Sequence, residues 1–189
     1  KGEEHPYYIA AAYGTALYIG DAVIKVAGGS NAAAFEAPGA GSFGIGTLPN
    51  IESATVGDGN RITGVIVGFG ADPSALDKQY NPASTERIAW VADDPALIFE
   101  IQADGAVPAA SMGLNAVLIA THAGSTTTGL SGMELDTTSD APAADASNQL
   151  LIVKAVDRED NDTTITQAKV EVMINEHTEN QGTVGTLGI

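Results

Sequence analysis

The chain has 189 residues, with 24 acidic and 8 basic side chains and a formal net charge of −16. Such an acidic surface would repel a phosphate backbone, so the composition argues against nucleic-acid binding. The lack of cysteine excludes disulfides and thiol chemistry, and no window approaches the roughly 18 consecutive apolar residues of a membrane helix, so no membrane partner is expected.

Glycine is abundant, with 22 residues, and long helix-forming side chains are few, which favours β-structure with many turns. About ten short strands separated by turn residues predict an all-β fold, an antiparallel small barrel or sandwich with a long glycine-rich arm and an extended tail. We expect a body over residues 1–136, which includes the arm, and a C-terminal strand pair with its tail over 137–189, packed on the same body.

The first strands are predicted at Tyr7–Ala12 and Ala16–Val26. Apolar residues alternate over Thr15–Gly20, and Gly20-Asp21 is a turn signal inside the second stretch. The glycine-rich stretch Ala27–Gly46 then carries Phe35 and Phe43. It is either a flexible loop or an arm that becomes ordered only against a neighbouring subunit, anchored by the two phenylalanines. Both phenylalanines are therefore candidate partner contacts.

A second hairpin is predicted from Asn50–Val56 and Ile62–Phe69, which flank the turn residues Gly-Asp-Gly-Asn. The nearly apolar run over Ile62–Phe69 is typical of a strand buried on both faces or bent at a barrel corner. A polar connection over Asp72–Thr85 follows, in which Tyr80 is a further candidate anchor for a partner.

The best-organised stretch is Arg87–Gly105, which we predict to be a β-hairpin. Its two alternating runs flank the turn residues Asp93–Pro95, whose aspartates can cap their own backbone. Trp90 on the first strand and Phe99 on the second are expected in one core, because buried aromatics contribute most to a small core.

The last third of the chain alternates strands with polar loops. Strands are predicted at Ala116–His122, at Met133–Leu135, at Asn148–Val156 and at Lys169–Ile174. The tail Glu179–Ile189 is rich in glycine and threonine. Its apolar Leu187 and Ile189 are candidate partner contacts, which would become ordered on an assembly.

An acidic cluster interrupts the C-terminal strand pair, at Asp157, Glu159, Asp160 and Asp162. Oxygen ligands at such spacing suit calcium, but a glycine at the sixth loop position and a glutamate at the twelfth are both missing. The cluster is better interpreted as a solvated turn, and a cation is the alternative.

No catalytic, cofactor-binding or metal-binding residue is assigned from the sequence. His5, His122 and His177 lie far apart without nearby cysteine, so they do not form a zinc pattern and are expected at the surface or at strand ends. Asp93 and Asp94 are adjacent, so on a strand they point to opposite faces and cannot flank one glycosidic bond. The segment Gly129–Met133 lacks the second glycine of a serine nucleophile elbow.

Four segments carry a resemblance to a known class of proteins: HPYYIAAAYGTALYIGDAV, TLPNIESATVGDGNRITGVIVGF, YNPASTERIAWVADDPALIFEIQADG and MGLNAVL. Together they resemble the capsid decoration, cement or head-stabilisation proteins of tailed bacteriophages. The likeness extends over about Tyr7 to Asp157 and rests on packing motifs. The arm at Ala27–Gly46 and the acidic loop at Asp157–Asp162 depart from it.

The resemblance implies a structural virion protein on the capsid exterior, bound to the major capsid protein as a homo-oligomer, commonly a trimer. It implies no enzymatic activity and no cofactor. The alternative is a soluble all-β binding module that recognises a carbohydrate or protein partner, and a hydrolase with an unrecognised site is a third possibility. Association with particles, glycan binding and substrate turnover distinguish the three.

Overall fold

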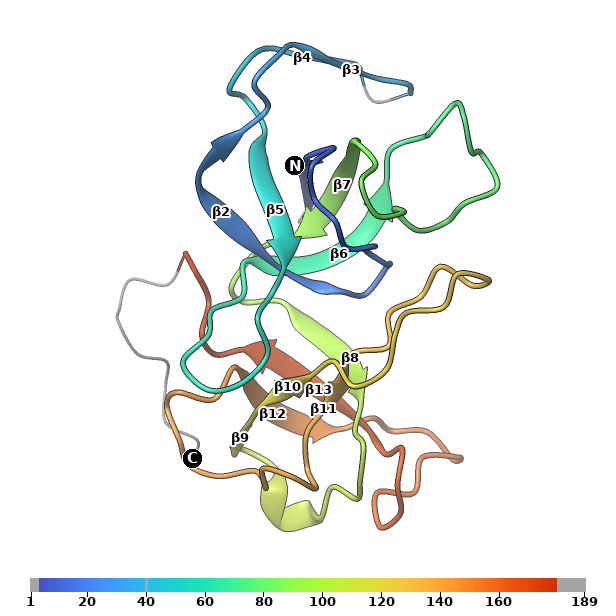
Figure 1. Cartoon of the computed structure of the whole chain (residues 1–189). Helices are drawn as coiled ribbons and strands as arrows, with labels where there is room; N and C mark the ends of the chain where they lie inside the picture. Colours follow the sequence, from blue (N-terminus) through green and yellow to red (C-terminus); the bar gives the residue numbers. More distant parts are fainter. Residues whose placement is uncertain (1–3, 40, 180–189) are drawn as a thin grey trace. The chain divides into compact units, whose positions relative to one another are not determined.

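The computed structural model describes residues 4–39 and 41–179, and the protein is all-β (Figure 1). One short 3-10 helix, η1, spans Ala109–Ser111. In the described residues no helix is long and apolar enough to cross a membrane. The strands are β1 (Glu4–Ile9), β2 (Ala22–Ser30), β3 (Phe35–Ala37), β4 (Gly41–Phe43), β5 (Pro49–Ser53), β6 (Gly64–Phe69), β7 (Arg87–Ala92), β8 (Ile98–Gln102), β9 (Asn115–Ala116), β10 (Leu118–Ile119), β11 (Glu134–Leu135), β12 (Leu150–Ala155) and β13 (Lys169–Ile174).

The chain forms two compact units, whose bounds differ from the expected division at residue 136. Among the described residues, the first unit contains 4–39, 41–54, 63–94 and 122–132, and the second contains 55–62, 95–121 and 133–179. Each unit therefore gathers segments that are distant in sequence. A boundary based on composition alone misses this arrangement, because it assumes that each unit is one continuous stretch.

The first unit is a closed barrel with the strand order β1-β5-β2-β6-β7, in which β7 pairs back onto β1. Every pair is antiparallel except β1 with β5. Its core contains apolar side chains from all five strands and from the loop between β1 and β2, namely Tyr7, Ile9, Leu17, Val23, Ile51, Ile66, Ala89 and Val91. The barrel therefore has a continuous apolar interior, as a small closed sheet requires.

The predicted hairpin at Arg87–Gly105 is wrong in its pairing, although both of its strands exist. β7 pairs with β1 and β6, whereas β8 pairs with β13 in the second unit. The residues Asp93–Pro95 therefore connect the two units and do not form a hairpin turn. Trp90 and Phe99 belong to different units and are both only half-buried, so the expected common core is also wrong.

The second predicted hairpin is likewise corrected. β5 and β6 are both present, but they pair on opposite sides of β2. At the start of β6, Gly64 has no room for a side chain, since a Cβ there would lie 2.3 Å from the carbonyl oxygen of Ala92. This close approach explains the first of the two glycines in this largely apolar strand.

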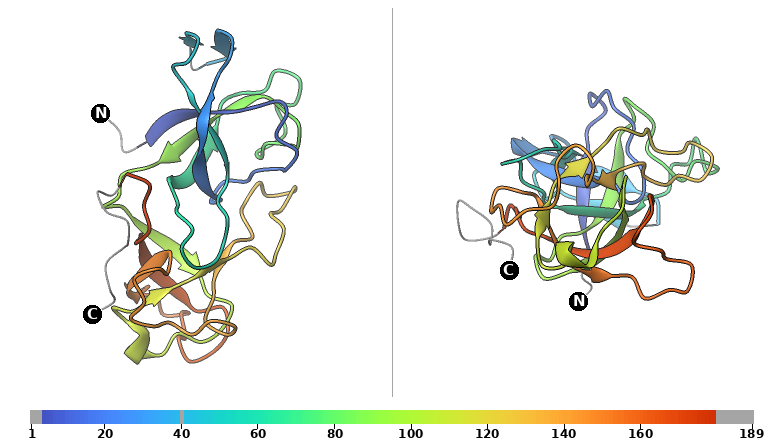
Figure 2. Two further views of the ribbon diagram at one scale, coloured as in Figure 1. Left: turned by 60° about the vertical axis from the view of Figure 1, so that its left-hand side comes forward. Right: turned by 90° about the horizontal axis from the view of Figure 1, so that it is seen from below.

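The glycine-rich arm is more ordered than a flexible loop. β2 continues to Ser30, and β3 and β4 form a short antiparallel hairpin in which Phe35 lies opposite Phe43. Two views show this hairpin extending beyond the end of the barrel strands (Figures 1 and 2). At its base the Asn31 side chain donates to the Gly44 carbonyl (2.8 Å) and accepts from the Leu48 amide (2.9 Å).

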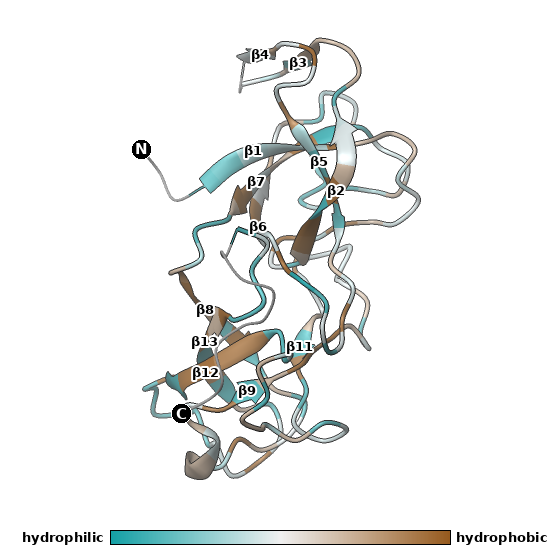
Figure 3. Ribbon diagram, turned by 90° about the vertical axis from the view of Figure 1, so that its left-hand side faces the viewer, coloured by the Kyte–Doolittle hydropathy of each residue, from teal (hydrophilic) through white to brown (hydrophobic). Residues whose placement is uncertain are grey.

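The second unit is built on an antiparallel sheet with the order β8-β13-β12-β9. The predicted strand pair near the C-terminus is confirmed as β12 and β13, and a bulge lies between Ile152 and Lys154. Along β13 the buried residues Val170, Val172 and Ile174 alternate with half-buried ones. Figure 3 shows that β12 is largely hydrophobic. In the first unit, the same view shows that β2 becomes less hydrophobic toward the arm.

A buried glutamine organises the loops of the second unit. Gln149 is 0% exposed, its oxygen accepts from the amides of Gly57 (3.0 Å) and Leu118 (3.3 Å), and its nitrogen donates to the Thr55 carbonyl (2.9 Å). One side chain thereby satisfies three backbone groups of two different segments, as buried polar groups require.

Candidate functional site

The candidate site lies in the first unit, where the arm meets the barrel. Phe35 and Phe43, expected to be partner contacts, pack with Tyr8 and Trp90 against the buried Ala37, Leu48 and Ile88. The rings of Tyr8 and Phe35 meet edge to face, with centroids 5.6 Å apart. The two phenylalanines are half-buried, whereas Ile45 beyond them is 71% exposed.

The third candidate contact, Tyr80, lies in a different aromatic pair. Its ring stacks on that of Tyr18, with centroids 5.3 Å apart and an interplanar angle of 14°. Gly124 approaches the Tyr18 ring so closely that a Cβ would lie 2.2 Å from it. Leu187 and Ile189 lie outside the described residues.

A small pocket opens beside the arm, with a volume of about 180 Å³. Three segments line it: the β3 end of the arm, the loop that follows β6 and the start of β7. Its apolar wall includes Phe35, Ala37 and Ile88, and its charged groups are Glu36, Asp72, Glu86 and Arg87. Sequence reasoning missed this pocket, because no motif connects residues 36, 72 and 86.

Arg87 is 7% exposed, and its guanidinium holds the loop that forms one side of the pocket. Its Nε donates to the Gly70 carbonyl (2.6 Å) and its Nη1 donates to the Tyr80 carbonyl (2.9 Å). The guanidinium carbon lies 5.2 Å from the centroid of the Phe69 ring. Burial lowers the pKa of Arg87, and the nearby Asp72 partly opposes this effect.

The three carboxylates of the pocket each accept a hydrogen bond from a neighbouring group. The hydroxyl of Ser42 donates to Glu36, the phenol of Tyr8 donates to Glu86, and the Ser74 amide donates to Asp72 (2.8 Å). Burial, then the hydrogen bond and charge of Glu86, raise the pKa of Tyr8 to about 12. An ionised carboxylate has about four acceptor positions, so each of the three keeps acceptor capacity.

Asp93 does not cap a hairpin turn. Its carboxylate accepts from the Tyr7 hydroxyl (2.6 Å) and lies 2.7 Å from Nδ1 of His5. These contacts tie the start of β1 to the residue after β7, and the exposed His5 is thus placed by the barrel. His122 is also exposed. His177 is only 2% exposed, but it follows the end of β13 and bridges to Ile62, so of the two expected positions it takes the one at a strand end.

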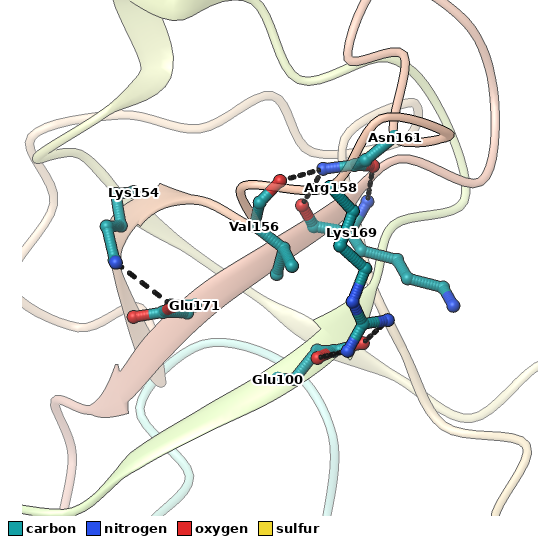
Figure 4. Close-up of polar contacts among 7 residues, drawn as sticks. All are labelled: Glu100, Lys154, Val156, Arg158, Asn161, Lys169 and Glu171. Carbon is teal, nitrogen blue, oxygen red and sulfur yellow. Dashed lines mark hydrogen bonds and ion pairs between the residues drawn. The ribbon is translucent and has the colours of Figure 1, made fainter.

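The acidic loop of the second unit is organised by its uncharged and basic residues (Figure 4). The Asn161 side chain donates to the carbonyls of Val156 (2.8 Å) and Lys169 (2.9 Å), while Arg158 forms a two-pronged ion pair with Glu100 (2.9 and 2.7 Å). Across residues 4–39 and 41–179 no grouping of three His, Cys, Asp or Glu side chains could hold a metal ion.

Comparison of the chain with protein-family models, curated proteins and solved structures found no match. The geometry of the arm and its pocket is therefore the basis of the functional argument.

Proposed function

We propose that the protein is a structural component of a tailed-phage virion, which decorates the capsid exterior and stabilises the shell by bridging capsomers. Its partner is the major capsid protein, and it binds as a trimer. The resemblance of the four sequence segments suggests this role. The observation that carries the proposal is the arm, a hairpin that extends beyond the barrel strands (Figure 1). Its Phe35 and Phe43 are half-buried against the barrel, and its Ile45 is exposed to a partner.

Such a role requires contact area more than chemistry. A subunit at a threefold or quasi-threefold junction meets equivalent partners when it is itself threefold. A projecting hairpin with aromatic side chains supplies interface area of the kind that dominates protein–protein binding energies. The net charge of −16 keeps the free subunit soluble and favours a basic docking surface on the shell.

Cryo-electron microscopy of the particle whose genome encodes this chain tests the proposal. The expected result is density for the barrel on the outer surface, between capsomers, with the arm in contact with the shell. A position inside the shell or on the tail, or absence from purified particles, would refute the proposal.

The alternative is a soluble binding module that recognises a carbohydrate or a protein. The half-buried, stacked pair Tyr18 and Tyr80 favours it, because aromatic rings provide flat apolar surface with a polar edge. Saturable binding to a glycan array, lost in Tyr80→Ala, would support this alternative in place of decoration.

A further inference from the structure

We propose that the pocket beside the arm receives one arginine side chain of the protein partner. The volume of about 180 Å³ is below the roughly 300–1,000 Å³ of pockets that hold drug-sized ligands. It suits a single side chain inserted from a neighbouring surface. The pocket lies entirely within the first unit, so the barrel and its arm suffice to form it.

The charges that line the pocket select a cation. Glu36, Asp72 and Glu86 contribute three carboxylates, against the one guanidinium of Arg87. That guanidinium already donates to the carbonyls of Gly70 and Tyr80, so its hydrogen bonds are directed to the protein itself. The pocket therefore keeps an excess of negative charge, which would repel an anion and attract a cation.

The walls select a cation with an apolar stem. Phe35, Ala37, Pro38 and Ile88 form an apolar wall, against which the methylene groups of a long side chain can pack. A free inorganic cation would gain nothing from this wall.

Arginine fits these features better than lysine does. Its planar guanidinium can bind a carboxylate through two parallel hydrogen bonds, stacks on aromatic rings and is more weakly hydrated than an ammonium group. Glu36, Asp72 and Glu86 provide several directions from which such a fork can be accepted, and Phe35 provides the ring. The acidity of the whole protein would bring a basic partner surface toward this site.

The inference rests on the proposed function only for the identity of the partner, and the pocket can be tested alone. The probe is N-acetyl-arginine amide, titrated into the full-length isotope-labelled protein at low salt and followed by amide chemical shifts. We expect saturable shifts at Ala37, Gly70, Ala71 and Ile88, with a dissociation constant on the order of 1 mM, as is reasonable for one side chain.

Two ligands control for charge and shape. N-acetyl-citrulline amide, the uncharged isostere of the probe, should cause no saturable shift at these positions. N-acetyl-lysine amide should bind at least about threefold more weakly, because it cannot form the paired hydrogen bonds. Equal binding of citrulline amide would overturn the pocket proposal, and equal binding of lysine amide would overturn the assignment to arginine.

Variants with isosteric amides test the residues. Glu86→Gln and Asp72→Asn retain an oxygen that accepts from Tyr8 or Ser74, so the fold should persist, as unchanged Trp90 emission would verify. Each variant should raise the dissociation constant of the arginine probe at least about threefold. Asp77→Asn removes the same charge from an exposed position of the same loop and should leave binding unchanged. An equal loss in all three variants would overturn the proposal.

Particle attachment separates failure of the pocket from failure of the proposed function. If the probe binds as expected but the protein does not attach to particles, the pocket stands and decoration fails. If the wild-type protein attaches to particles and the variants Glu86→Gln and Asp72→Asn attach equally well, decoration stands. The proposal that the pocket binds the partner then fails.

Discussion

At the residue scale, the hydrogen bond from Tyr8 to Glu86 has a measurable consequence. Burial and Glu86 raise the pKa of Tyr8 to about 12, so its phenol should ionise after that of a tyrosine with an ordinary pKa of about 10. Since the folded pKa is the higher one, the stability that this group contributes is complete below about pH 10 and is lost as pH rises to about 12.

Ultraviolet titration of tyrosinate checks this expectation. Burial also raises the pKa of Tyr18, so in Tyr8→Phe the late ionisation should lose one tyrosine and not vanish. In Glu86→Gln, which removes the neighbouring negative charge, the Tyr8 ionisation should shift to lower pH. Glu52→Gln, a substitution of another glutamate in the same unit, is the control and should leave the late ionisation in place. An unchanged titration in Glu86→Gln would contradict the assigned cause.

Gln149 supports a second prediction at this scale. In Gln149→Leu the amides of Gly57 and Leu118 and the carbonyl of Thr55 lose their partner. Leu118 is buried, Gly57 is half-buried and Thr55 is exposed. The unpaired Leu118 amide should therefore lower the free energy of unfolding by about 1–3 kcal/mol, and the other two groups should add less because water can reach them. Urea denaturation measures the free energy of unfolding. Gln79→Leu changes an exposed glutamine and serves as the control. A loss below about 1 kcal/mol would mean that the loops find other partners.

Neither of these residues could be identified from the sequence alone. Gln149 stands beside an apolar run that predicts a strand, and nothing local indicates that its amide reaches residues 55, 57 and 118. Tyr8 and Glu86 are likewise 78 positions apart. Such contacts depend on strand pairing, which alternation of residue types does not specify.

At the element scale, hydropathy predicted strands better than it predicted their partners. β12 and β13 were expected and are adjacent, because a polar loop joins them and each has one apolar face. β7 and β8 were also expected, yet they pair with strands far away in sequence. The Asp-Asp-Pro sequence between them breaks a strand in either arrangement, so turn chemistry alone cannot distinguish a hairpin from a crossing between units.

The arm supports a third prediction. Because β3 pairs with β4 and both phenylalanines pack on the barrel, amides of 35–39 and 41–43 should exchange more slowly in the free protein than those of the exposed loop 74–79. Phe43→Ala should speed exchange in the arm several-fold, whereas Ile45→Ala, at a largely exposed position, should not. Hydrogen exchange followed by mass spectrometry measures both effects.

Fast exchange of the arm in the free protein, with protection only on particles, would contradict the packing of the phenylalanines. It would instead support the sequence-based expectation that the arm becomes ordered against a neighbouring subunit. The glycine-rich composition favoured that expectation, because glycine loses the most backbone entropy on ordering. The aromatic cluster with Leu48 and Ile88 supplies the opposing apolar contacts.

At the scale of the whole molecule, composition predicts the class of fold but does not indicate how the chain divides into compact units. Abundant glycine, scarce helix formers and short alternating runs are typical of an all-β protein, and the structure is all-β. The two units interleave along the chain, so no linker with a distinct composition separates them. The pocket residues come from the arm, a loop and β7, which only the closed barrel brings together.

The final prediction concerns attachment of the whole protein to its particle. With a net charge of −16, the protein should bind a basic shell surface through attraction that salt weakens, since the screening length is about 10 Å at 0.1 M salt and about 3 Å at 1 M. Raising sodium chloride from about 0.05 M to about 0.5 M should therefore lower the bound fraction in co-sedimentation at least several-fold. Sucrose, which does not screen charge, should leave that fraction unchanged. Attachment that persists unchanged in salt would assign the binding energy to the apolar arm and would remove the basic docking surface from the proposal.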